Sequence, residues 1–183
     1  MPNLPGFGNP PTMPAQYAVL IDRLLLYCEW GAADLTRDQF NDTHGARTNS
    51  IGWDIWHTAR TIDNILHFVF EREQPVWLKE GFHEAWGLPK VDQGTGQDPD
   101  DAYRLDFPEP AEFTKYTLAV KAAVVPRVAA MSMEYLASPQ FIRPWGDVPR
   151  MEAMGHGLIG HGNGHLGRVS LARNLWGLKG LPF

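Results

Sequence analysis

Four long stretches with helical periodicity, each closed by proline or glycine, constrain the fold of this chain more than any other feature of its sequence. Apolar residues recur at helical spacing over residues 15–29, 50–72, 111–137 and 150–176. Gly31, Pro75, Pro139 and Gly177 supply the stop signals. No convincing run alternates between apolar and polar residues, and no internal repeat occurs. We therefore expect an all-α, up-down four-helix bundle.

Residues 74–110 form a long irregular insertion between the second and third expected helices. The segment is rich in proline and glycine, yet it carries Trp77 and Trp86, which a flexible linker would not need. Because a connection this long in a compact domain is more often functional than idle, we expect an ordered loop whose two indoles wall the functional site. The chain then forms a single domain over residues 1–183, with an irregular, proline-rich arm at residues 1–13.

Length and charge exclude several classes of protein. The chain has 183 residues and a net charge of −5, with no basic run, so it lacks the electrostatic footprint of a nucleic-acid-binding protein. It has no stretch of about 18 apolar residues that could span a membrane. The single Cys28 excludes an intramolecular disulfide and suits a reducing compartment, and the proline-broken N-terminus is a poor signal peptide. We expect a cytoplasmic protein.

Two histidines four residues apart, His161 and His165, form the pattern that carries most chemical information. On a helix they share one face, with Cβ atoms about 6 Å apart, which suits joint binding of one metal ion. Leu158, Val169 and Trp176 fall on the same stripe, so both rings point toward the core. Core imidazoles need polar partners, and a metal would satisfy both at once. Two independently hydrogen-bonded core histidines remain the alternative.

A third ligand has to come from another helix, and His57 on the second helix is the best candidate. The main apolar stripe of that helix, which includes Ile55 and Ile62, lies nearly opposite His57. His57 shares its own face with Trp53 and Phe68. Either this helix is covered on both sides, or His57 is exposed.

Small residues form a second stripe beside the histidines of the fourth helix: Ala153, Gly157, Gly160, Gly164 and Gly167. A glycine inside a helix costs about 1 kcal/mol relative to alanine, so several together need compensation. The stripe indicates close approach of a substrate or cofactor, simple helix–helix contact through small residues, or an interrupted helix. His156 falls on the polar face and is excluded as a ligand.

The segments 50–60 (SIGWDIWHTAR) and 161–168 (HGNGHLGR) together resemble the DinB/YfiT-like superfamily of metal-binding four-helix bundles. Residues 77–96 and 116–120 also look like one branch of this group, so the resemblance covers most of the chain. Each motif is weakly specific alone. Their order, with one histidine on the second helix and H-x-x-x-H on the fourth, is much more specific.

The resemblance implies that His57, His161 and His165 are the three metal ligands, with no ligand missing. It also implies a second helix that is buried on both sides, which a homodimer would explain. The superfamily is similar in fold to transferases and isomerases that use low-molecular-weight thiols, and to metal-dependent hydrolases. The motif fixes the metal site but not the reaction.

Three imidazoles leave at least one coordination position open, as in catalytic sites, and zinc, nickel or iron would suit them. Asp54 or Asp63 could orient a ligand, but as carboxylates of a helix surface we expect them to be solvated. We expect Cys28 to be a small core residue rather than a nucleophile.

The sequence therefore predicts a metal-dependent thiol S-transferase or hydrolase that acts on a small molecule, with a low-molecular-weight thiol as a candidate co-substrate. The alternative is a non-catalytic, stress-related dimeric bundle that only binds metal. Neither nucleic acid nor a membrane is an expected partner.

Overall fold

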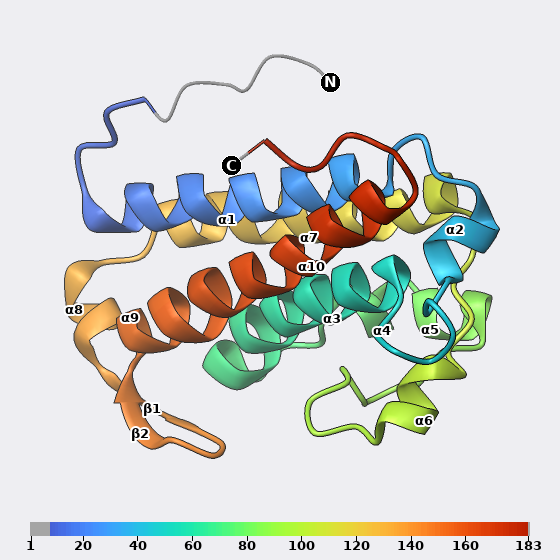
Figure 1. Cartoon of the computed structure of the whole chain (residues 1–183). Coiled ribbons are helices and arrows are strands. Elements are labelled where there is room, and N and C mark those ends of the chain that lie inside the picture. The colour runs from blue at the N-terminus through green and yellow to red at the C-terminus, as the bar shows by residue number, and fades with distance from the viewer. Residues whose placement is uncertain (1–7, 183) are drawn as a thin grey trace.

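The computed structural model describes residues 8–182 and is mostly helical, as expected (Figure 1). Its long helical segments are α1 (Met13–Ala32), α3 (Ile51–Asp63) with the π-helix η1 (Asn64–Val69), α7 (Pro110–Ala129), and a last segment made of α9 (Arg150–Glu152), the π-helix η2 (Ala153–Gly160) and α10 (His161–Leu175). Helix α1 packs along α7, and α10 packs against both α3 and α1.

Local sequence signals account for the starts of these helices. The Thr12 hydroxyl accepts a hydrogen bond from the Ala15 N–H, and Pro14 lies in the first turn of α1, where a missing N–H costs nothing. The Ser50 hydroxyl caps α3 by accepting from the Trp53 N–H at 3.1 Å. Of the arm expected at residues 1–13, residues 1–7 lie outside the described part, and residues 8–12 have no regular secondary structure.

The core lies between the long segments and is built from their apolar faces. Ile21 and Leu25 of α1, Val120 and Val124 of α7 and Leu166 of α10 are fully buried. Among the described residues, no helix is long and apolar enough to cross a membrane.

A small hairpin follows the third long helix and was not expected from the sequence. Strand β1 (Pro139–Ile142) pairs antiparallel with β2 (Gly146–Pro149), and Phe141 lies opposite Asp147. Strands of four residues are too short to show the alternation of apolar and polar residues that marks a strand in a sequence. The third helix also ends earlier than expected: α7 stops soon after Pro126, and Ser132 caps a separate helix α8 (Met133–Ala137).

Polar connections hold four further short helices: α2 (Arg37–Asn41), α4 (Val76–Lys79), α5 (Phe82–Trp86) and α6 (Pro99–Tyr103). Asp63 at the end of α3 fixes the position of the start of the long connection. Its carboxylate accepts hydrogen bonds from the backbone N–H groups of Val76 and Trp77, each at 2.9 Å. The rest of the connection folds back beside α3 (Figure 1).

Candidate metal centre

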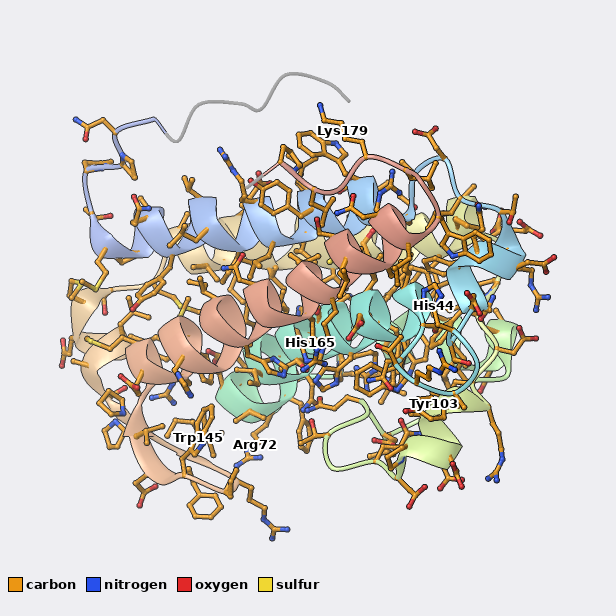
Figure 2. The ribbon with its side chains drawn as sticks, viewed as in Figure 1. His44, Arg72, Tyr103, Trp145, His165 and Lys179 are labelled. Atoms are coloured by element: carbon orange, nitrogen blue, oxygen red, sulfur yellow. The ribbon has the colours of Figure 1, made fainter. Side chains whose placement is uncertain are left out.

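Three imidazoles from two helices meet at one point. His57 on α3 and His161 on α10 approach with their Nε2 atoms 3.1 Å apart, and the Nε2 atoms of His161 and His165 are 3.0 Å apart. One ring nitrogen of each histidine lies within 4.8 Å of the other two. Figure 2 shows His165 where α10 crosses α3. The structure thus brings together all three residues proposed as ligands, including the one that periodicity alone left open.

Close packing of the two helices allows this meeting. Helices α3 and α10 run antiparallel, because Asp54 contacts His165 whereas His57, further along α3, contacts His161, earlier on α10. At Gly162 a Cβ would lie 3.2 Å from a methyl carbon of Leu24 and 3.3 Å from that of Thr58. Glycine at this position therefore removes the side chain that would push the helices apart.

The outward nitrogen of His57 is held by the long connection. Its Nδ1–H donates to the backbone carbonyl of Gln93, which leaves the Nε2 lone pair facing the other histidines. The Trp53 ring stacks on the imidazole at 4.8 Å with an interplanar angle of 17°, and its Nε1–H donates to Gln97 at 3.0 Å. Gly94 packs against both rings, because a Cβ at this position would lie only 2.7 Å from Trp53 Cζ2 and 3.2 Å from His57 Nδ1.

The outward nitrogen of His165 is held by Asp54. His165 Nδ1–H donates to Asp54 Oδ1 at 2.6 Å, and the Arg168 guanidinium lies 3.6 Å from the same oxygen. The expectation that Asp54 is solvated was wrong, because its side chain is 2% exposed. The expectation for Asp63 was wrong as well: this carboxylate is fully buried and belongs to a structural cluster.

Burial keeps the three imidazoles neutral. Desolvation lowers the pKa of His57 to about 3, and that of His161 and His165 to about 4 each. Burial raises the pKa of Asp54 to about 7, while the nearby Arg168 guanidinium acts in the opposite direction. The histidines at neutral pH are therefore in the unprotonated form that a metal ion requires.

Hydrogen bonding among the three histidines alone would leave the cluster incompletely satisfied. His57 and His165 both present Nε2 lone pairs to His161 Nε2, which carries at most one proton to share. A cation at the centre would satisfy all three nitrogens. A tetrahedral ion with bonds of about 2.0–2.1 Å needs ligand nitrogens about 3.3 Å apart, close to the 3.1 Å and 3.0 Å that separate His161 Nε2 from the other two Nε2 atoms.

A sequence model described as the DinB superfamily matches residues 29–169, which contain all three histidines. The chain belongs to the DinB superfamily. A crystal structure of a conserved protein from Enterococcus faecalis has the same fold, with a TM-score of 0.77 and 22% sequence identity, covering 90% of this chain and 96% of that one. No curated protein matches the sequence.

In this DinB-superfamily chain, the face of α3 that carries His57 is covered by the chain's own residues. Every residue of α3 is buried, and Gln93, Gly94 and Gln97 of the long connection lie on His57 and Trp53. Burial of this face therefore needs no second subunit, and the homodimer stays a prediction.

The long connection contributes to the site through different residues from those expected. Trp77 is fully buried in an aromatic cluster with Trp56 and Tyr116, and Trp86 stacks on Phe113. Among the described ring contacts, neither indole touches the three histidines, so the expectation that they wall the site was wrong. Backbone and amide groups of residues 93–97 cover it instead.

Other sequence predictions were correct. Cys28 is a fully buried core residue, and burial raises the pKa of its thiol. His156 lies outside the histidine cluster, with its ring 5.4 Å from that of Trp145.

Two contributors to the site were not predicted, the ring of Trp53 and the backbone of Gln93. The sequence placed Trp53 on the same face as His57, one helical turn earlier, but did not assign it the stacking contact that it makes. Nothing in the sequence marks Gln93, since only its backbone carbonyl contacts His57.

Proposed function

We propose that this DinB-superfamily protein is a metal-dependent enzyme, a thiol S-transferase or hydrolase that acts on a small molecule through a divalent ion held by His57, His161 and His165. The observation that carries this proposal is the convergence of three neutral Nε2 atoms, two of them with their Nδ1–H groups bound to protein oxygens. Zinc, nickel or iron suits such ligands, and a low-molecular-weight thiol is the co-substrate we propose for the transferase.

A divalent ion with three protein ligands would supply Lewis acidity, lowering the pKa of a bound water or thiol and polarising a substrate carbonyl. The protein's own groups would hold the ligands still. Asp54 keeps the proton on His165 Nδ1, and the Gln93 carbonyl keeps it on His57 Nδ1. Trp53 and Gln97 shield one side of the cluster from water.

Metal analysis of the purified protein tests the site. We expect about one divalent ion per chain, lost in His57→Ala and His161→Ala but retained in His156→Ala, a matched variant whose histidine lies outside the cluster. Anomalous scattering at the absorption edges of zinc, nickel and iron would identify the ion. Equal metal content in all four proteins would contradict the site.

A screen of small thiols with electrophilic substrates, and of esters and amides, then tests turnover. We expect metal-dependent consumption of one substrate class, abolished in His57→Ala. A protein that retains its metal but consumes neither thiol nor ester would favour the non-catalytic, stress-related metal-binding bundle over the enzyme.

We also propose the assembly in which this site works: a single-domain, up-down four-helix bundle with residues 74–110 as an insertion, acting as a cytoplasmic homodimer without nucleic-acid or membrane partners. Exposed apolar side chains on α10, Leu171 and Leu175, support a subunit contact. The net charge of −5 opposes binding to nucleic acid. Sedimentation velocity tests the dimer, and a monomer at micromolar concentration would contradict it.

A further inference from the structure

Residues 91–97 of the long connection form a strap along α3, on the side of His57 that faces away from the other two histidines. Three donors on one face of α3, spaced three or four residues apart, hold this strap. Trp53 Nε1–H donates to Gln97 Oε1 at 3.0 Å, His57 Nδ1–H donates to the Gln93 carbonyl, and Arg60 Nη2–H donates to the Val91 carbonyl at 3.4 Å. The middle hydrogen bond of the strap is therefore made by a candidate metal ligand.

Hydrogen bonds rather than apolar packing keep the strap in place. Its one large apolar side chain, Val91, is 81% exposed, and of residues 91–97 only Gly94 is buried. Both ends are fixed. The Pro89 carbonyl accepts from Trp77 Nε1–H at 3.0 Å, and Asp98 caps α6. Because each hydrogen bond contributes only modestly to stability, the strap can leave α3 without unfolding the bundle.

The closed strap also leaves buried polar atoms unpaired. Gln93 Oε1 and the Nε and Nη1 atoms of Arg60 are buried without a hydrogen-bond partner among the described residues. Arg60 Nη1 lies 3.9 Å from Asp63 Oδ2, which is too long for a hydrogen bond. Polar atoms that are buried and unpaired are unfavourable, and water would reach them if the strap moved away. The closed position therefore has a cost that opening relieves.

The middle hydrogen bond depends on which nitrogen of His57 carries the proton. A neutral imidazole has one N–H. On Nδ1 it donates to the Gln93 carbonyl, whereas on Nε2 it would donate to His161 Nε2, 3.1 Å away, and leave two lone pairs facing each other at Gln93. A metal ion on Nε2 excludes the second arrangement. His165 has less freedom, because its Nδ1–H donates to the Asp54 carboxylate at 2.6 Å, a stronger charge-assisted bond.

We propose that residues 91–97 form a metal-dependent lid. Metal binding to His57 Nε2 holds the strap closed, and in the metal-free protein the strap opens for part of the time and uncovers His57. The inference rests on the metal-binding part of the proposed function and adds a regulation of the same site. By linkage, any change that destabilises the closed strap must also weaken metal binding.

Hydrogen exchange of single amides, followed by NMR on the full chain without metal and with Zn²⁺, tests the lid. Gly94 N–H donates to Asp92 Oδ1 at 2.8 Å, and Gln97 N–H donates to the Gly94 carbonyl at 3.3 Å. We expect Zn²⁺ to slow the exchange of both amides on the order of tenfold. The paired amides of the β1–β2 hairpin, an element of similar size, should exchange at the same rate in both samples.

Equal strap exchange with and without bound Zn²⁺ would overturn the lid and leave the metal site in place. Equal slowing in the strap and the hairpin would overturn it as well, because zinc would then stabilise the protein in general. A protein that binds no Zn²⁺ in the metal analysis would overturn the metal site itself, and the lid with it.

Two variants of the strap test the linkage from the other direction. Gln97→Ala removes the acceptor of Trp53 Nε1–H without touching a histidine. It should speed the exchange of the Gly94 amide and weaken Zn²⁺ binding about fivefold. Thr95→Ala is the matched control, because Thr95 is exposed and its described hydrogen bond is to Gln93 Nε2 within the strap, so it should change neither quantity. Faster strap exchange in Gln97→Ala at an unchanged zinc affinity would refute the coupling.

Discussion

Two carboxylates of α3, nine residues apart, show how burial assigns different tasks to the same chemical group. Asp54 accepts from His165 and lies near Arg168, so it acts on the candidate metal centre. Asp63 accepts from the Tyr116 hydroxyl and from the backbone N–H groups of Val76 and Trp77, so it joins α3, α4 and α7. Neither role follows from the residue type, and each depends on what the fold brings to the carboxylate.

Exchanging each carboxylate for its amide separates the two roles. Asp54→Asn should weaken metal binding by roughly 10- to 100-fold, because a neutral amide oxygen orients His165 less firmly than the carboxylate does, while the fold persists. Asp63→Asn should lower the free energy of unfolding by about 2–4 kcal/mol, because one of the two accepting oxygens becomes an NH2 group that faces a buried donor and the negative charge is lost. It should leave the metal affinity of the folded protein unchanged. Competition with a chromophoric chelator and urea unfolding measure the two quantities. Equal metal affinities in both variants would refute the positioning role of Asp54.

The connection between α3 and α7 contacts the site through a tight turn, and Gly94 makes that contact possible. Gly94 and Gly96 both have positive φ angles, +88° and +71°, but only Gly94 has close neighbours where a Cβ would stand. Alanine at either position should cost about 1–2 kcal/mol for the left-handed backbone. Gly94→Ala should in addition displace Trp53 or His57 and weaken metal binding, whereas Gly96→Ala should not. Metal affinities that fall equally in both variants would show that the turn's conformation, rather than its contact with His57, matters.

Two glycines of the last helix differ in their surroundings: Gly162, which is not part of the stripe of small residues, is closely packed, whereas Gly167 of that stripe is open. Gly162 faces Leu24 and Thr58 at 3.2–3.3 Å, but a Cβ on Gly167 would meet nothing within 4 Å. Gly167→Ala should stabilise the protein by up to about 1 kcal/mol through helix propensity, and Gly162→Ala should destabilise it by about 1–2 kcal/mol through overcrowding. Thermal and urea unfolding test both changes. If Gly167→Ala destabilised the protein, another surface, such as that of a second subunit, would have to pack there.

At the scale of the molecule, local sequence signals predicted what depends on one helix, and failed where two distant segments meet. The spacing of His161 and His165 correctly indicated a shared face. The environment of His57 depends on a carbonyl 36 residues later in the chain, which no periodicity reveals. The two π-helical segments were also missed, because no residue pattern distinguishes them from the α-helices they continue.

The buried histidine cluster also predicts how acid affects the stability of the whole metal-free protein. Unfolded imidazoles have a pKa near 6.5, whereas burial lowers the pKa to about 3 in His57 and about 4 in His161 and His165. Between these values the unfolded chain binds protons that the folded chain does not, so the unfolding free energy falls as the pH is lowered, by up to about 1.4 kcal/mol per pH unit for each histidine. Asp54 opposes this, because its raised folded pKa of about 7 favours the folded state on acidification, but it is one group against three. Urea unfolding of metal-free protein between pH 7 and pH 5 should therefore show declining stability, with a smaller decline in His57→Gln. A flat profile would mean that the imidazoles are not held neutral by burial.

Bound metal should raise the stability at pH 7 and steepen the decline, because protons then compete with the ion for the same Nε2 atoms.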